Sequence, residues 1–529
     1  MGILNKTQKV SESPTRPGAN KTKNKFDIAD LYSGPVSGSE QQQPSTNSES
    51  GLDEKLRQAY FWMINNAIIS PYYDIEYNKG ANSTYSIGDS KSRVTFPSDQ
   101  SYSSFVLLPL LNLVTRRRCL IIGGPGRGKT ASAILMGVIA GYPLKDIKRA
   151  IQHGQPQMTI SDLLGNPIPS DLMTAKDMDD IKISWRKWLG MRIKIIDEYN
   201  RIPTRTQSAL LTVLGDNYAE ILDQIYECPE AAWYLTANDD AGGGTYQVIE
   251  ALRDRIDIVV KALHFNSRFI GDLLTRIEQG IKPEESVPKQ IIFTEEEISQ
   301  INKEILDVTL PEKLLRRIEF FSSHFELYES ASEQLEYKTK DNVKISGLEF
   351  RAIASAETGK DKLKDLGNQT KNGLSVRSIM TCLIFIKALS YFRGEKEVQF
   401  DDVRHILPFV FHDKLVQNPD APFFEQPGNT VYRVDRVSWI RKLFDLSCAE
   451  YDRLDLDKQD PLEELEKKFD RGLDGVTEKE AEEELRKISR IMEDWSKSRK
   501  LYGHVFDDVL KLKYLHQRYS NYLRWLQNK

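Results

Sequence analysis

The feature that most constrains this chain is a glycine-rich turn between an apolar strand and a helix. The segment CLIIGGPGRGKTASA begins at Cys119, and Gly123–Thr130 fits the pattern G-x-x-x-x-G-K-T. In such a turn the backbone N–H groups form a nest around a phosphate, and the following helix presents its positive N-terminal end to the same anion. We therefore expect nucleotide phosphates to be bound by Gly123, Gly124, Pro125, Gly126, Arg127, Gly128, Lys129, Thr130 and Ala131.

Two residues of this turn have chemical tasks of their own. Lys129 reaches the β- and γ-phosphates, and the hydroxyl of Thr130 ligates Mg²⁺. The alternative is a tight glycine turn with an idle lysine. The apolar strand before the turn and the helix after it argue against that alternative.

Two adjacent carboxylates follow a second apolar strand, in RIKIIDEYNRIP at 192–203. Asp197 and Glu198 emerge at the carboxyl end of this strand, where open α/β sheets place their ligand chemistry. Asp197 would hold Mg²⁺ through water, and Glu198 would polarise the attacking water. Adjacent carboxylates are often only a solvated strand end. Because these follow a phosphate turn, we interpret them as a catalytic pair.

Further polar residues stand near later strands. Asn238 ends the apolar strand AAWYLTAND and could orient the same water, although asparagine is also common in turns at strand ends. Arg253 and Arg255 precede the last strand. A charged helix end is the ordinary explanation for such a pair. However, phosphoryl-transfer proteins also use an arginine supplied from outside to stabilise charge on the γ-phosphate.

The composition excludes several classes of protein. The chain has 529 residues, 40% of them apolar and 28% charged, which is typical of a soluble protein with two or three domains. Residues 105–114 form the longest apolar stretch, about half of what a membrane-spanning helix needs, and the N-terminus has no signal-peptide core. The net charge of -4 gives no general attraction to nucleic acid. Four scattered cysteines without a C-x-x-C pair indicate core residues and a cytoplasmic location.

The pattern along the chain changes several times. Apolar strands alternate with helices from 118 to about 262, which predicts a parallel sheet covered on both faces, and helical periodicity prevails afterwards. Near the end, Thr477 and Glu480 form a capping-box start, and two apolar faces predict a helical hairpin. We expect a disordered polar tail at 1–50, a helical and irregular extension at 51–99, an α/β nucleotide-binding domain at 100–266, a helical domain at 267–420 with an insertion at about 329–372, and a helical extension at 421–529.

The ordered set of motifs resembles the MoxR branch of the AAA+ ATPases. The matching segments are GGPGRGKT, IIDEYNRIPTRTQSALL, LTAN, GGTYQVIEALRDRI and GLSVRS followed by FDDVRHILPFVFHDKL. The most specific of these is the continuation after the acidic pair, Asn200-Arg201 with TQSALL. The resemblance covers about 100–280 and 365–416. It implies an AAA+ P-loop NTPase core with a five-stranded parallel sheet between helices, then an α-helical lid, here followed by an all-α extension.

The resemblance also implies roles for single residues. Asn238 matches sensor 1, Arg255 matches the arginine finger that acts on the neighbouring subunit, and Arg377 matches sensor 2 of the lid. Residues 159–165 stand where the family places its helix-2 insert. Two positions depart from the family pattern: Tyr199 replaces an aliphatic residue, and Arg253 precedes the finger. The choice between Arg253 and Arg255 therefore stays open.

The partners implied by the resemblance are ATP, Mg²⁺ and proteins. Members form rings, usually of six subunits, because the finger comes from a neighbour, and they remodel or activate a partner complex. That partner often carries a von Willebrand factor A domain, whose D-x-S-x-S motif is absent from this sequence, so such a partner would be a separate protein. No motif in the sequence separates adenine from guanine.

Two other functions remain open. The first is a nucleic-acid motor subunit of a restriction or defence system, for which the triplet at 116–118 is weak support and the acidic balance none. The second is a scaffold that binds nucleotide and barely hydrolyses it, which the complete set of catalytic positions disfavours.

Overall fold

The computed structural model describes most of the chain after the polar tail. The described residues are 51–78, 83–86, 93–96, 100–177, 180–238, 246, 248–262, 264–327, 339–345, 365–458, 460, 462–498 and 503–528. The tail predicted to be disordered, 1–50, and most of the insertion predicted at about 329–372 lie outside the described residues.

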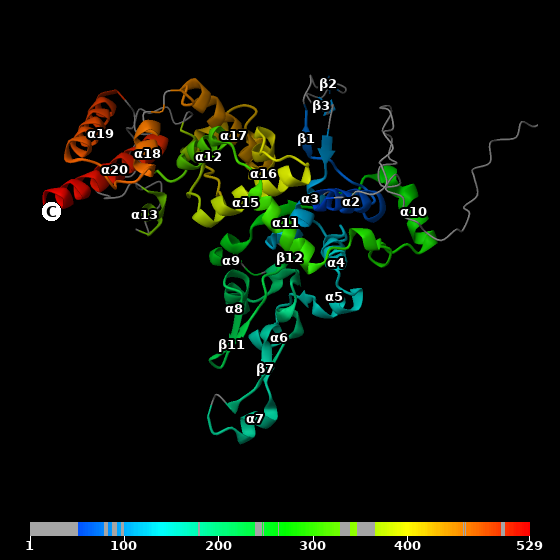
Figure 1. The fold of residues 1–529 in the computed structure, drawn as a ribbon. Coiled ribbons are helices and arrows are strands. Elements are labelled where there is room, and N and C mark those ends of the chain that lie inside the picture. Colours follow the sequence, from blue (N-terminus) through cyan, green and yellow to red (C-terminus); the bar gives the residue numbers. More distant parts are fainter. Residues whose placement is uncertain are drawn as a thin grey trace, which may run out of the picture. The chain divides into compact units, whose positions relative to one another are not determined.

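A five-stranded parallel sheet lies at the centre of the described fold (Figure 1). Its order in space is β13-β5-β12-β9-β6, and every neighbouring pair is parallel. Parallel neighbours need crossover connections, and helices supply them here. The predicted α/β core is therefore confirmed. Its strands are β5 Arg118–Ile122, β6 Gln152–His153, β9 Ile193–Asp197, β12 Ala232–Ala237 and β13 Ile258–Lys261.

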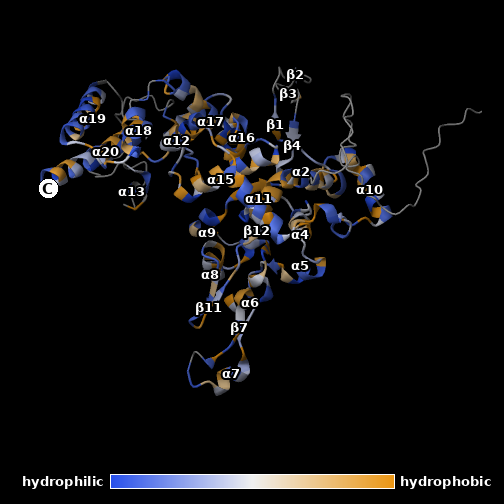
Figure 2. Ribbon diagram, viewed as in Figure 1, coloured by the Kyte–Doolittle hydropathy of each residue, from blue (hydrophilic) through white to orange (hydrophobic). Residues whose placement is uncertain are grey.

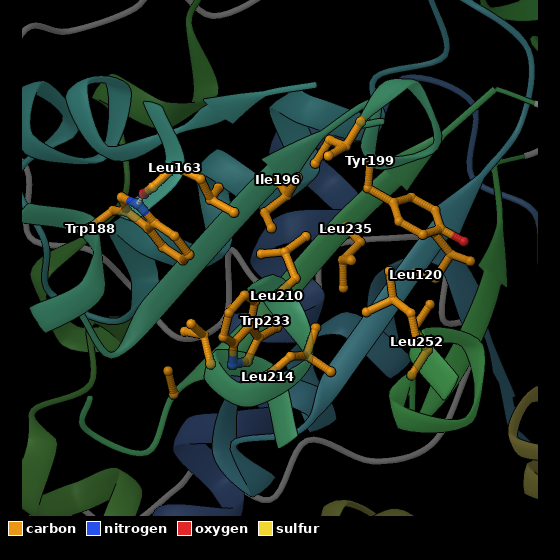
Figure 3. Close-up of a cluster of buried hydrophobic side chains, with 14 of the residues drawn as sticks. Leu120, Leu163, Trp188, Ile196, Tyr199, Leu210, Leu214, Trp233, Leu235 and Leu252 are labelled. Carbon is orange, nitrogen blue, oxygen red and sulfur yellow. Dashed lines mark hydrogen bonds between the residues drawn. The ribbon is translucent and has the colours of Figure 1, made fainter. Parts of the chain in front are cut away.

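Both faces of the sheet are buried because the strands are apolar at nearly every position. Trp233 and Leu235 of β12 point into a cluster with Leu210 and Leu252 from the covering helices (Figure 3). Tyr234, between them in sequence, lies on the opposite face, as the alternation of a strand requires. The covering helices are α4 Lys129–Ile139, α5 Leu144–Ala150, α6 Ile160–Leu164, α8 Thr204–Gly215 and α9 Glu250–Arg255.

Helix α3, Ser104–Thr115, joins the sheet to the helical region. All of its apolar residues except Phe105 are buried. It contacts β12 and β13 on one side and α11 and α15 on the other. Asn112 donates to Trp233 O at 3.0 Å, and Tyr234 donates its hydroxyl to Pro109 O at 2.9 Å. These bonds satisfy polar groups that would otherwise be buried without partners.

Two hairpins extend from the sheet domain. Strands β7 and β8, Gly165–Pro167 and Ile183–Trp185, pair antiparallel, and α7, Pro169–Thr174, lies between them in sequence at the tip (Figure 1). This hairpin continues from the segment where the helix-2 insert is expected. Strands β10 and β11, Tyr218–Ile221 and Gln224–Glu227, form the second hairpin.

The extension before the sheet domain packs on the helical domain. Tyr60 lies edge-on against Tyr102 and Phe392. The hydroxyl of Tyr77 donates to Asp402 at 2.7 Å, and Arg393 pairs with the same buried carboxylate at 2.8 Å. The elements of this extension are α2 Leu52–Trp62, a π-helical turn Met63–Ala67, and the strand pairs β1 Ile75–Tyr77 with β4 Gln100–Tyr102 and β2 Ser83–Ser86 with β3 Arg93–Phe96.

Helices make up the rest of the described chain. Helix α17 packs on α12 and α16, and Phe444 of α17 lies edge-on against Phe321 of α12. All four cysteines are buried free thiols, as predicted. The helices of this region are α10 Ile270–Gln279, α11 Glu295–Asp307, α12 Glu312–Ser323, α13 Lys340–Ile345, α15 Val376–Phe392, α16 Phe400–Phe411 and α17 Arg436–Arg453.

The last helices have an apolar cluster of their own. Helix α19, Glu478–Ser498, packs against α20, Gly503–Gln527, with α18, Glu463–Asp470, beside them. The predicted helical hairpin is confirmed, and the capping box is present because Thr477 N donates to Glu480 and Glu480 N donates back to Thr477. Hydrophilic residues prevail along α19 (Figure 2). Among the described residues, no helix combines the length and apolarity that crossing a bilayer requires.

Replacing one core residue of α8 tests the packing on the sheet. Leu210 is fully buried against β12, so Leu210→Ala should lower the free energy of unfolding by about 2–5 kcal/mol. Ser208→Ala, an exposed change on the same helix, should change it by less than about 0.5 kcal/mol. Urea unfolding followed by tryptophan fluorescence measures this, because Trp188 and Trp233 lie in the same cluster. Equal midpoints for the two variants would contradict the packing described.

Candidate active site

The carboxyl ends of three neighbouring strands bring the predicted residues together. Ala237 of β12 pairs with Ile122 of β5, and Leu235 pairs with Ile196 of β9. The residues that follow these strands therefore meet at one edge of the sheet. They are Gly123, Asp197 with Glu198, and Asn238.

The glycine-rich turn forms an open cradle before α4. Gly126 and Gly128 have φ of 73° and 75°, a left-handed conformation that favours glycine. A Cβ added to either would have no heavy atom within 4 Å, so the space above the turn is open. Residues 125–128 are exposed, as is Ala131. An open nest of backbone N–H groups at a helix N-terminus fits the phosphates of a nucleotide.

Lys129 lies at the bottom of this cradle, almost fully buried. Its Nζ donates to Gly123 O at 2.7 Å, Gly124 O at 2.9 Å and Asn238 Oδ1 at 2.8 Å. Neutral oxygens thus hold the ammonium group at the start of the turn. Hydrogen bonds from a cation to phosphate oxygens are stronger than those to neutral oxygens, so this ammonium group suits the phosphates of a nucleotide.

Thr130 and Asp197 present two oxygen ligands side by side. The Thr130 hydroxyl donates to Asp197 Oδ1 at 2.7 Å, and Thr236 donates to the same oxygen at 2.6 Å. His153 Nδ1 lies 3.4 Å from the other carboxylate oxygen. A hydroxyl and a carboxylate beside a phosphate cradle are the donor set that Mg²⁺ takes together with phosphate oxygens. The residues present therefore fit both nucleotide and Mg²⁺.

Glu198 is held from both sides of its carboxylate. Asn238 Nδ2 donates to Oε1 at 3.0 Å, and Arg201 Nε lies 3.1 Å from Oε2. The backbone N of Glu198 donates to Thr236 Oγ1 at 2.9 Å. Its φ of 53° is unusual for a residue other than glycine, and such strained conformations concentrate at functional sites. These contacts fix the direction in which the carboxylate points.

The backbone of Glu198 also needs the glycine beside it. Gly154 N donates to Asp197 O at 2.7 Å, and a Cβ at Gly154 would lie 2.3 Å from Glu198 O. The sequence patterns do not mark Gly154, His153, Arg201 or Thr236 as site residues. Arg201 was noted only as part of a family-specific string. For Thr236 the available signal was its position two residues before Asn238 on the same strand.

Arg255 and Arg377 make their side-chain contacts away from this cluster. Arg255 ends α9, and its half-buried side chain lies against Gly215, where an added Cβ would be 2.3 Å from its Nε. Arg377, in the first turn of α15, pairs with Asp254 Oδ2 at 3.1 Å. Arg253 is exposed. The structure thus brings Lys129, Thr130, Asp197, Glu198 and Asn238 together, and leaves these arginines at the junction of α9 with the helical domain.

A largely apolar pocket of about 580 Å³ adjoins the cradle. Gly126 and Ala131 contribute one side, Ile68 and Tyr72 another, and Leu273 and Ile277 of α10 a third. Apolar residues recur along α10 at three- and four-residue spacing, among the hydrophilic residues that Figure 2 also shows there, so they share one face of the helix. A pocket with this lining beside a phosphate cradle can accept a nucleoside base.

Comparison with known proteins agrees with this geometry. The family model described as "ATPase family associated with various cellular activities (AAA)" matches residues 118–258. Chaperone MoxR1 of Mycobacterium tuberculosis is 22% identical over 313 residues, which are 59% of this chain and 71% of that protein. A crystal structure of a candidate ATPase from Cytophaga hutchinsonii covers 64% of this chain and 89% of its own, with a TM-score of 0.44 and 19% identity. With the phosphate cradle and the paired carboxylates on one sheet edge, the family match identifies residues 118–258 as an ATP-hydrolysing AAA+ domain, and the chain is similar to the chaperone MoxR1.

Proposed function

We propose that this chain is the subunit of a ring that uses ATP hydrolysis to remodel or activate a partner protein. The observation that carries the proposal is the side chain of Asn238, which bridges Lys129 and Glu198 beside the Thr130–Asp197 pair. This arrangement joins a phosphate-binding cation, a pair of Mg²⁺ ligands and a general base in one network. Such a network serves hydrolysis rather than nucleotide binding alone.

The residues divide the work of hydrolysis between them. The cradle and Lys129 bind the phosphates, and the nucleoside base of ATP occupies the pocket lined by α10. Thr130 and Asp197 would hold Mg²⁺, which would supply positive charge beside the bound phosphates. Glu198 accepts a proton from the attacking water, and Asn238 with Arg201 keeps its carboxylate oriented. These two contacts hold the Glu198 carboxylate in one orientation before water binds, as a general base requires.

Arg255 completes the site of a neighbouring subunit. Its own α9 is packed on α8 and on the helical domain, and its side chain makes its contacts away from the Lys129–Glu198 network. A guanidinium at such a position suits action in trans, where it stabilises charge on the γ-phosphate. We assign this role to Arg255 rather than Arg253, because Arg255 stands at the position that matches the arginine finger and its side chain packs closely over Gly215 of α8.

The tip of the β7–β8 hairpin favours a protein client over nucleic acid. Leu172 and Met173 of α7 are 52% and 89% exposed. The described residues 169–177 of this tip contain two aspartates and one lysine, so they offer phosphates no net attraction. Exposed apolar side chains on a projecting tip indicate contact with a protein. A separate protein with a von Willebrand factor A domain is our candidate client.

Substitution of the general base separates binding from hydrolysis. Glu198→Gln should keep ATP affinity within about twofold and slow hydrolysis at least about 100-fold, because the amide cannot accept the proton. Phosphate release and equilibrium ATP binding measure the two effects. Glu220→Gln, an exposed acidic residue on β10, is the matched control and should hydrolyse at the normal rate. Normal turnover by Glu198→Gln would overturn the assignment of the base.

The same variant tests the class of client. A Glu198→Gln ring held in ATP should retain its client during purification from the native host, and we expect one protein to be enriched. Lys129→Ala, which should not bind nucleotide, is the control and should retain none. Enrichment of polynucleotide would instead support a nucleic-acid motor. In that case DNA or RNA should stimulate ATP hydrolysis, and this stimulation should disappear as the salt concentration rises.

A further inference from the structure

Asp254 lies between the two arginines of α9 and is held by the helical domain. Ser375 Oγ donates to its Oδ1 at 3.0 Å, and Arg377 NH1 donates to its Oδ2 at 3.1 Å. Ser375 also caps α15 by accepting from Ser378 N at 3.2 Å. The residue that matches sensor 2 is thus paired with a carboxylate directly beside Arg255.

The backbone at the same place is held by a buried lysine. Lys414 Nζ donates to Arg253 O at 3.1 Å and also to Asp254 O. These are carbonyls of the last turn of α9, and Arg253 O also accepts from the backbone N of Ile256 at 3.2 Å. Burial lowers the pKa of Lys414 to about 8, and Asp254 and Asp257 oppose that shift. Lys414 Nζ also lies 3.8 Å from Asp254 Oδ1, so Lys414 holds the end of α9 to the helical domain through these two carbonyls and pairs with the carboxylate as well.

Asp257, two residues after Arg255, provides a contrast with Asp254. It is 2% exposed, accepts from Thr381 Oγ1 at 2.5 Å, and accepts from Arg118 N at 2.9 Å. Arg377 and Asp254 are 42% and 37% exposed in their pair. Exposed ion pairs stabilise little, so the pair at Asp254 can be exchanged for another partner, whereas the bonds of Asp257 persist.

We propose that Asp254 competes with the γ-phosphate of ATP for Arg377, and that this exchange links the nucleotide in one subunit to the position of Arg255, which acts on the next. The inference rests on the proposed function, because it takes Arg377 as a γ-phosphate contact. Asp254 and Arg255 are adjacent on a six-residue helix. Release of the Asp254 carboxylate therefore loosens the helix turn that carries Arg255, while Lys414 and Asp257 keep the helix attached.

The competition has a consequence for nucleotide affinity. Binding ATP requires Arg377 to leave Asp254, whereas ADP has no γ-phosphate to attract Arg377. In a Glu198→Gln background, Asp254→Asn should therefore tighten ATP binding about three- to fivefold and leave ADP binding unchanged. Asp254→Ala should act in the same direction. If Asp254 had only a structural role, its substitution would weaken the binding of ATP and of ADP to a similar extent.

A double-mutant cycle tests whether the effect passes through Arg377. Arg377→Ala alone should weaken the binding of ATP more than the binding of ADP. The double variant with Asp254→Asn should have the same ratio of ATP and ADP dissociation constants as Arg377→Ala. Glu250→Gln removes a charge from the first turn of the same helix and is the matched control, with an unchanged ratio expected. The single variant Asp254→Asn, which keeps Glu198, should hydrolyse ATP more slowly than the wild type although its KM for ATP is lower. The reason is that Arg255 is held less firmly toward the neighbouring site.

The outcomes distinguish this inference from the proposed function. If the wild-type chain neither binds nor hydrolyses ATP, the proposed function fails and this inference fails with it. If the wild type hydrolyses ATP but Asp254→Asn leaves the ATP-to-ADP ratio unchanged, only the competition is overturned. The same holds if Asp254→Asn shifts the ratio equally with and without Arg377. Thermal unfolding of each variant identifies any loss of ratio that comes from misfolding.

Discussion

The site depends on the parallel register of β5, β12 and β9. Because Ala237 pairs with Ile122 and Leu235 with Ile196, the loops after these strands start from one edge of the sheet. A shift of one residue would turn the side chains of a strand to the opposite face. Asn238 could then not reach both Lys129 and Glu198, as it does at 2.8 and 3.0 Å. The packing of the apolar strands thus positions the polar residues that follow them.

Sequence patterns predicted those parts of the structure that arise from local rules. The strands around Cys119, Ile195 and Tyr234 are apolar at nearly every position, as buried parallel strands must be. The glycine turn and the acidic pair follow such strands directly, so their meeting point follows from the sheet topology alone. The helical hairpin near the C-terminus was predictable in the same way, because its cap and its apolar faces are local features.

Other parts could not be predicted because they depend on contacts between distant segments. The bonds of Tyr77 to Asp402 and of Arg377 to Asp254 join residues 325 and 123 positions apart. No spacing rule links such positions. Arg201 stood in the sequence only as part of a family-specific string, and its ion pair with Glu198, three residues earlier, accompanies a left-handed backbone at that glutamate. Sequence patterns therefore predicted the phosphate turn, the acidic pair and Asn238, but not the contacts that Thr236 and Arg201 make with the acidic pair.

In the proposed ring a neighbouring subunit completes each active site, and mixing two inactive variants tests this arrangement. Glu198→Gln lacks the base but keeps Arg255, and Arg255→Ala lacks the finger but keeps the base. Each should hydrolyse ATP slowly alone, and mixed rings should recover activity where an Arg255→Ala site adjoins a Glu198→Gln subunit. Arg253→Ala is the matched control and should need no complementation. If the mixture is no more active than the sum of the two variants, or if Arg255→Ala alone is fully active, Arg255 does not complete the site of a neighbouring subunit.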